Sequence, residues 1–155
     1  MASKKAVVEC PCPCPEVVAI RRKDGKYLIP GIIDNRPYLF FIETTKDDPR
    51  ILFEIRKHHH SGFVCLKSIY VQKFWYRTYG EWIIPDGCDE CNMDTQLCIV
   101  DISNSGPEFV VIYNRGNNKF CTCRSAVPGS PECLIANQDG QERALVLEVV
   151  HHPQA

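Results

Sequence analysis

The sequence has 155 residues, a length typical of one domain, and its 45 % hydrophobic content excludes disorder of the whole chain. The formal charge is −1, so no overall positive field exists to attract nucleic acid, and no apolar run approaches the ~20 residues of a membrane span. We therefore expect a soluble, unsecreted protein that binds neither nucleic acid nor membranes.

The N-terminal residues 1–15 form an arm that precedes the patterned part of the chain. Cys10, Cys12 and Cys14 alternate with prolines, which hold a chain extended and exclude a helix. Alternate thiols on an extended segment are suited to a soft metal such as Zn²⁺ or Cu⁺. The alternative is a proline-rich arm without a metal.

A lysine followed by an aromatic residue occurs three times along the chain. The pairs are Lys26-Tyr27, Lys73-Phe74 and Lys119-Phe120, and their lysines are 47 and 46 residues apart. Each pair follows an apolar, strand-like run and a short turn-rich segment; the runs are 17–20, 63–66 and 109–112. Each unit is therefore predicted to contain a β-hairpin.

A second pattern, an acid between two apolar residues, recurs at the same period. It comprises Phe53-Glu54-Ile55, Val100-Asp101-Ile102 and Leu147-Glu148-Val149, at intervals of 47 residues. A half-buried strand has this pattern, because the acid faces water while its neighbours face the core. We interpret these segments as equivalent closing strands of three repeats.

Three units of about 47 residues with about four strands each predict an all-β fold, the β-trefoil, because propellers typically need 4 to 8 blades. The repeats are expected at about 17–57, 62–102 and 108–150, within a single domain that spans 16–152. Residues 63–79 are predicted to form two strands and a turn, since their β-branched and aromatic residues are poor helix formers. The strongest helical competitor is 141–150, although its end alternates as a strand does.

The second repeat resembles the agglutinin domain of amaranthin-type plant lectins. The residues that carry the resemblance are 64–75 and Tyr79-Gly80-Glu81-Trp82-Ile83; it spans about 17–150 and is clearest over about 62–102. It implies a β-trefoil that binds the galactosyl-N-acetylgalactosamine disaccharide known as the T-antigen, without catalysis, in the plant cytoplasm and nucleus. Amaranthin has two trefoils per chain and a sugar site between subunits. A comparable site in this single trefoil would need a homodimer or a different pocket.

The resemblance carries over only part of the family's site. Trp82-Ile83 match the family's Trp-Ile, and Tyr79, Gly80 and Glu81 stand in the preceding loop. An aromatic face can stack on the apolar face of galactose while polar groups bind its hydroxyls. The predicted carbohydrate-binding residues are Trp82, Tyr79, Glu81 and Arg77. The alternative is that Trp82 begins an inward strand and simply packs.

The ten cysteines are expected to be mostly reduced, because a reducing compartment keeps thiols free. Cys65 and Cys98 lie in apolar runs and are expected in the core. Cys121 stands where Leu28 and Trp75 stand in the other repeats, which favours packing. Cys88 and Cys91 have the spacing of zinc ligands, so a zinc ion shared with Cys121 and Cys123 is the alternative.

The histidines at 58–60 and 151–152 follow the closing strands of the first and third repeats, where surface turns are expected. The chain contains no G-x-S-x-G, P-loop, G-x-G-x-x-G or H-E-x-x-H motif, so we predict a protein without catalytic activity or cofactor. The leading interpretation is a glycan-binding lectin that forms a homodimer. The alternatives are a protein-interaction or inhibitor trefoil, or an enzyme or small-molecule binder that uses the cysteine and histidine groups.

Overall fold

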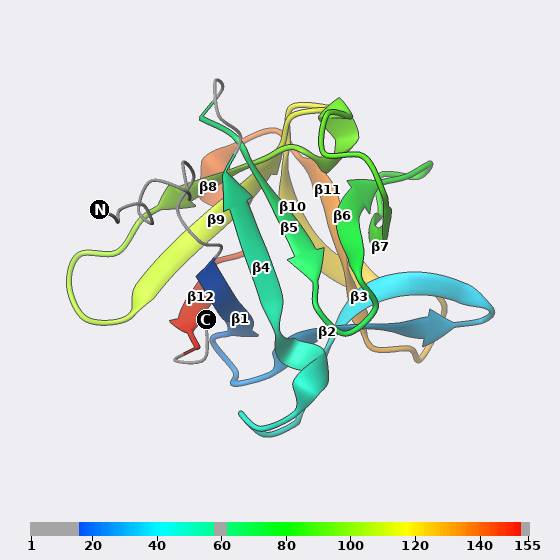
Figure 1. Cartoon of the computed structure of the whole chain (residues 1–155), viewed down its shortest axis with the longest axis horizontal. Helices are drawn as coiled ribbons and strands as arrows, with labels where there is room; N and C mark the ends of the chain where they lie inside the picture. The colour runs from blue at the N-terminus through cyan, green and yellow to red at the C-terminus, as the bar shows by residue number, and fades with distance from the viewer. Residues whose placement is uncertain (1–15, 58–61, 153–155) are drawn as a thin grey trace, which may run out of the picture.

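The computed structural model describes residues 16–57 and 62–152, and within them the chain forms twelve strands and three short 3-10 helices (Figure 1). The first repeat contains β1 (Glu16–Arg22), β2 (Tyr27–Ile33), β3 (Arg36–Ile42), η2 (Pro49–Ile51) and β4 (Phe53–Lys57). The second contains β5 (Val64–Ser68), β6 (Lys73–Arg77), β7 (Ile83–Gly87), η3 (Met93–Thr95) and β8 (Leu97–Asp101). The third contains β9 (Glu108–Asn114), β10 (Lys119–Ser125), β11 (Glu132–Gln138), η4 (Gln141–Arg143) and β12 (Leu147–His151).

Six strands close into a barrel. The order around it is β1-β4-β5-β8-β9-β12, and β12 pairs with β1 to complete the ring. The other six strands form the hairpins β2–β3, β6–β7 and β10–β11, which cap one end of the barrel (Figure 1). This arrangement is a β-trefoil, so the fold predicted from the repeats is confirmed.

The turns of the hairpins follow from local residue chemistry. Asp34 and Asn35 form the two-residue turn between β2 and β3 with φ angles of 54° and 65°. Two left-handed residues are typical of a type I′ turn, whose twist matches that of the flanking strands, and Asp and Asn tolerate this conformation better than most residues. The predicted pair of strands in 63–79 is confirmed as β5 and β6. The segment 141–150 holds one turn of 3-10 helix before β12, so its strand-like end prevails.

Equivalent residues of the three hairpins meet in the core. Leu28, Trp75 and Cys121 each lie two residues after the repeated lysine, and each is fully buried. The Trp75 ring packs edge-on against Phe53 with centroids 5.3 Å apart. The prediction that Cys121 packs where Leu28 and Trp75 pack is confirmed. Cys65 is buried as expected, whereas Cys98 is only partly buried.

The structure corrects the register of the second repeated pattern. Phe53 and Leu147 begin β4 and β12, but Val100 and Asp101 lie at the end of β8, and Leu97 begins that strand. The three strand starts pair with the last residue of the next repeat's first strand; the pairs are Phe53–Ser68, Leu97–Asn114 and Leu147–Arg22. The equivalent position is therefore Leu97, which is fully buried like Phe53 and Leu147.

The structure describes only part of the segments for which an arm and surface histidines were predicted. The arm 1–15 and the histidines at 58–60 lie outside the described residues. His151 is half exposed and its ring contacts Glu108 at 2.7 Å. Within the described ranges, no helix has the length and apolar character needed to cross a membrane.

Candidate functional site

The turn between β6 and β7 positions three of the four residues that the sequence singled out. The chain reverses over residues 78–82, where the Thr78 N–H donates to the Trp82 carbonyl at 2.9 Å. Gly80 and Glu81 both adopt the left-handed conformation, with φ angles of 84° and 72°. A left-handed glutamate is uncommon, so the fold holds this turn in one particular shape. The turn leaves the Tyr79 side chain 97 % exposed.

The Trp82 ring lies over the point where the three hairpins meet. Below it is a small apolar cluster with one buried member from each repeat, namely Tyr38, Ile84 and Cys133. Tyr38 contacts the Trp82 ring edge-on, with centroids 5.6 Å apart. Trp82 also forms an isolated β-bridge to Ile135, so its backbone is fixed from both sides. Trp82 is thus partly a packing residue, although the residue as a whole is only partly buried.

Arg124 is the functional candidate beside Trp82 that sequence reasoning missed. Its guanidinium carbon lies 5.3 Å from the centre of the Trp82 ring, which is a cation–π contact. Arg124 is exposed, and within the described residues its guanidinium forms no ion pair or hydrogen bond. It belongs to β10 of the third repeat, 42 positions from Trp82, so no local pattern joins the two.

Glu81 extends this surface toward the third repeat. Its carbonyl accepts a hydrogen bond from the Ala136 N–H at 2.9 Å. The Lys119 pKa is raised mainly by the hydrogen bond from Lys119 to Asp139 at 2.7 Å, and the nearby Glu81 charge makes a smaller contribution in the same direction. Glu81 therefore borders a surface that carries both signs of charge.

Arg77 lies apart from these residues. It pairs with Ile83 across the β6–β7 hairpin, whereas Trp82 lies on the same face as Ile84 and Tyr76. Its guanidinium forms an ion pair with Asp94 at 2.7 Å, beside η3. The structure thus brings Trp82, Tyr79 and Glu81 together on one turn and places Arg77 on the opposite face of the hairpin.

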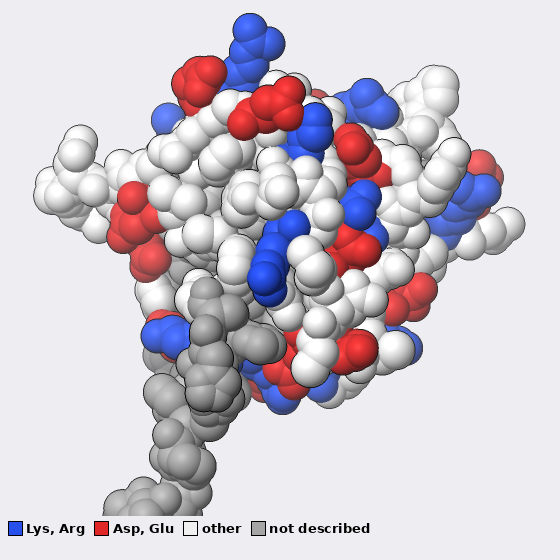
Figure 2. Space-filling view, turned by 90° about the horizontal axis from the view of Figure 1, so that it is seen from above, with Lys and Arg blue, Asp and Glu red and all other residues white. Residues whose placement is uncertain are grey.

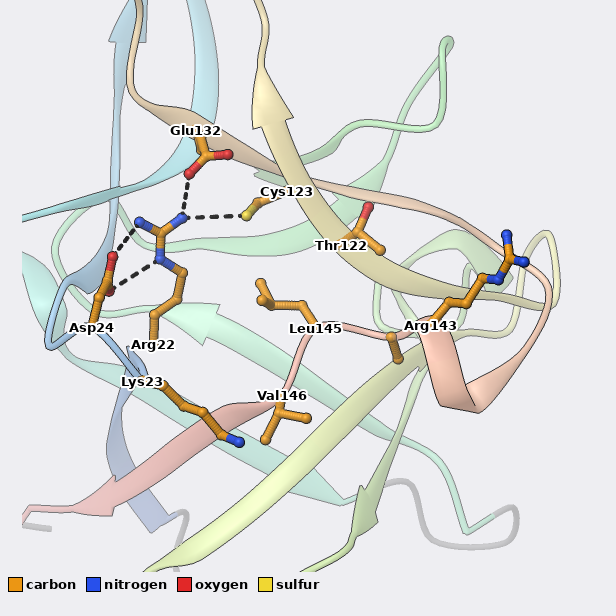
Figure 3. Close-up of a pocket in the computed structure, with 10 residues that line it drawn as sticks. Arg22, Lys23, Asp24, Thr122, Cys123, Glu132, Arg143, Leu145 and Val146 are labelled. Carbon is orange, nitrogen blue, oxygen red and sulfur yellow. Dashed lines mark hydrogen bonds and ion pairs between the residues drawn. The ribbon is translucent and has the colours of Figure 1, made fainter.

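The described residues also contain a pocket of 620 Å³ where the first and third repeats meet (Figure 3). The Arg22 side chain, only 11 % exposed, forms ion pairs with Asp24 at 2.7 Å and Glu132 at 2.6 Å. It also donates to the Cys123 sulfur at 3.3 Å and lies over the Phe41 ring. Burial alone would lower the Arg22 pKa, but its hydrogen bonds to Asp24, Glu132 and Cys123 outweigh burial and raise it.

The pocket has a thiol and an apolar floor. Burial raises the pKa of Cys123, and the hydrogen bond from Arg22 offsets only part of that effect, so the thiol is not activated as a nucleophile. Leu145 and Val146 form the floor, and Lys23 and Arg143 lie at its two ends (Figure 3). No local sequence pattern indicates this pocket, because Arg22 and Glu132 are 110 positions apart.

The cysteine pairs do not converge on a common centre. Cys88 and Cys91 are exposed, whereas Cys121 is buried in the barrel. Within the described parts of the chain, no three His, Cys, Asp or Glu side chains lie close enough together to hold a metal ion. The face seen in Figure 2 carries interspersed basic and acidic side chains rather than a patch of one sign.

Comparisons with solved structures define the class of protein as a β-trefoil. The designed threefold-symmetric protein ThreeFoil matches with a TM-score of 0.67 at 12 % identity, covering 86 % of this chain and 97 % of that one. The Polyporus squamosus lectin, solved with a human-type influenza-binding epitope, matches with a TM-score of 0.67 at 10 % identity, covering 90 % of this chain and 49 % of that one. The cytolethal distending toxin of Actinobacillus actinomycetemcomitans matches with a TM-score of 0.63 at 15 % identity, covering 89 % and 91 %. These likenesses show the fold alone.

The family is given by the sequence itself. A family model of the agglutinin domain matches residues 13–104, and the chain belongs to this family. The match ends after β8, so the third repeat is assigned by its structure rather than by the family model. A search of curated protein sequences finds no significant match. Family and fold together support a carbohydrate-binding lectin and suggest a protein without catalytic activity.

Proposed function

We propose that this lectin binds glycans that contain galactose or N-acetylgalactosamine, such as the T-antigen disaccharide, at the surface formed by Trp82, Tyr79, Glu81 and Arg124. The observation that carries the proposal is the partly buried Trp82 with the Arg124 guanidinium 5.3 Å from the centre of its ring. Among the residues that the structure describes, this guanidinium has no ion-pair or hydrogen-bond partner. Trp82-Ile83 are also the residues that match the site segment of amaranthin-type lectins. Galactose presents one apolar face, which suits an aromatic ring, and hydroxyls that suit a guanidinium.

Arg124 has two roles in this proposal. Because its guanidinium covers one face of Trp82, a sugar ring that stacks on this face displaces it. The displaced side chain stays at the rim, where its N–H groups donate to sugar hydroxyls. Tyr79, almost fully exposed at the tip of the turn, adds a second aromatic contact. Glu81 accepts hydrogen bonds from hydroxyls on the side that faces the third repeat.

We extend the proposal to a homodimer in the cytoplasm and nucleus. The sugar site of amaranthin lies between domains of different subunits, and a second copy of this trefoil could complete a site of that kind. The high exposure of Tyr79 supports this view, because its side chain is free to contact a sugar held by a second subunit. The seven cysteines in the described ranges all carry free thiols, which suits a reducing compartment.

The experiment is a glycan array with the reduced protein, followed by fluorescence titration with galactosyl-N-acetylgalactosamine. We expect Trp82→Ala to weaken binding about tenfold or more, since a ring–sugar stack provides on the order of 1–2 kcal/mol. Arg124→Ala should weaken it about threefold to tenfold. Tyr70→Ala removes another exposed aromatic side chain, far from the turn, and serves as the matched control.

Because Trp82 also packs on the apolar cluster of Tyr38, Ile84 and Cys133, circular dichroism must confirm that the Trp82→Ala protein is folded. Trp82→Phe provides a milder variant. Binding by Trp82→Ala within twofold of the original protein would refute the proposed site. Absence of galactosides among the array hits would refute the proposed specificity. Sedimentation velocity with and without sugar tests the dimer, and a monomer that binds sugar fully would refute the intersubunit site.

A further inference from the structure

The threefold symmetry of the backbone is broken at one of the three repeat junctions. At two junctions, the residue after the end of β5 or β9 donates its N–H to the carbonyl just before β4 or β8. These hydrogen bonds run from Ile69 to Leu52 at 3.1 Å and from Arg115 to Gln96 at 2.9 Å. The equivalent groups at the third junction are the Lys23 N–H and the Val146 carbonyl. Within the described residues no hydrogen bond joins them, so the β1–β2 turn stands away from the chain that enters β12.

Side-chain packing shows the same difference. The residue two positions before the closing strand is 1 % exposed at the first two junctions, as Ile51 and Thr95. Its equivalent at the third junction, Leu145, is only partly buried. The 620 Å³ pocket lies at this third junction, and Leu145 and Val146 are in its lining. The pocket therefore lies at the one repeat junction whose structure differs from that of the other two.

The charges around the pocket indicate the chemistry of a ligand. Asp24 and Glu132 are neutralised in part by Arg22, which lies between them. Lys23 and Arg143 line the pocket on either side of Leu145 (Figure 3), and within the described residues neither forms an ion pair. With three cationic and two acidic side chains, the pocket carries a net positive charge although the whole chain carries −1.

The pocket also differs from the Trp82 surface in having no aromatic side chain in its lining. A neutral sugar would lack the ring on which it usually stacks. A hydroxylated ring can still lie on the aliphatic floor and form hydrogen bonds with the Thr122 hydroxyl and the Glu132 carboxylate. Any further attraction would come from the charges of Lys23 and Arg143, which favour an anionic ligand.

We infer that this pocket is a second carbohydrate site, selective for acidic glycans that carry carboxylate or sulfate groups. The ring lies on Leu145 and Val146, and its anionic groups face Lys23 and Arg143. The choice of a glycan as the ligand class rests on the proposed lectin function. The site itself is separate from the Trp82 surface, so each can fail without the other.

Nuclear magnetic resonance titration of the ¹⁵N-labelled protein with digalacturonate tests the inference, with neutral galactobiose as the matched ligand. We expect digalacturonate to shift the amide resonances of Lys23 and Leu145 saturably, with little effect from galactobiose. The double variant Lys23→Gln/Arg143→Gln should weaken binding about fivefold or more, because each cation contributes a modest attraction in water. The control Arg36→Gln/Lys46→Gln removes two exposed cations outside the pocket and should stay within twofold.

Three results would overturn the inference. Absence of saturable shifts at Lys23 and Leu145 would mean that the pocket takes no acidic glycan. Equal binding of galactobiose would remove the role of charge, and inorganic sulfate that binds as tightly as digalacturonate would remove the role of the sugar ring. The resonances near Trp82, read in a parallel titration with galactosyl-N-acetylgalactosamine, report separately on the proposed function.

Discussion

Replacement of Ile51 and of Leu145 by alanine should have unequal effects on stability, although the two residues occupy equivalent positions. Ile51 is 1 % exposed and packs with Ala19, Tyr27 and Ile29. Ile51→Ala removes three buried carbons, about 2.4 kcal/mol at ~0.8 kcal/mol each, and leaves a closed cavity, so we expect a loss of about 3–4 kcal/mol. Leu145→Ala removes three carbons that already border the open pocket. Without a new closed cavity, the loss should be about 1–1.5 kcal/mol.

Urea unfolding followed by circular dichroism measures this difference. With an m-value of about 2 kcal/mol per molar, the midpoints of the two variants should be about 1 M apart while the m-value stays unchanged. Ile32→Ala, at a side chain that is 67 % exposed, is the control and should cost less than about 0.5 kcal/mol. Equal losses for Ile51→Ala and Leu145→Ala would refute the view that the third junction is open in solution.

Two further predictions concern titrating groups. The Asp48 carboxylate accepts hydrogen bonds from the Arg50 side chain, from Thr44 and from the Arg50 N–H, which hold its pKa far below the usual range. Its ionised form therefore stabilises the fold at neutral pH, and this contribution is lost progressively as the pH falls from about 4 toward the lowered pKa of the folded state. Asp48→Asn should thus cost about 1–2 kcal/mol at pH 7 and clearly less at pH 2; an equal cost at both would contradict the assignment. Burial raises the pKa of Cys121 to about 12, whereas Cys88 and Cys91 are exposed. In a reaction with a thiol reagent at pH 7.5, Cys88→Ser/Cys91→Ser should thus have two fewer rapidly reacting thiols than the original protein, and Cys121→Ser should have the same number. A smaller number of rapidly reacting thiols in Cys121→Ser would show that the barrel opens readily.

The hairpins could be predicted from the sequence because their signals are local. A lysine followed by an aromatic residue marks the start of β6 and β10, and Lys26 lies one residue before β2. The burial of Trp75 and Cys121 two residues after their lysines does not follow from the strand period, because residues two apart share a face; in β6 and β10 the pairing register shifts just before these residues. The closing strand β8 could not be placed in this way. Its segment contains more than one apolar-polar alternation, and the choice of Leu97 is made by pairing with Asn114 in the next repeat.

For the candidate site, too, the sequence could group residues on one turn but not residues that lie far apart in the chain. Trp82, Tyr79 and Glu81 lie on one turn, so a sequence resemblance could group them. Arg77 is close to them in sequence, but the alternation of side chains along β6 turns it toward Asp94. Arg124 joins Trp82 only through the meeting of two hairpins from different repeats, which the sequence pattern alone does not specify.

The closure of the barrel by β1 and β12 has a consequence for how the protein is made. Val18 pairs with His151, so the first strand of the fold has its partner near the far end of the described chain. During synthesis, β1 and β4 can pair early, but one edge of β1 stays open until the third repeat has left the ribosome. Pairings this distant in sequence are formed slowly. We therefore expect the nascent chain to depend on the third repeat, the part with the least family resemblance, to cover that edge and end its exposure to other chains.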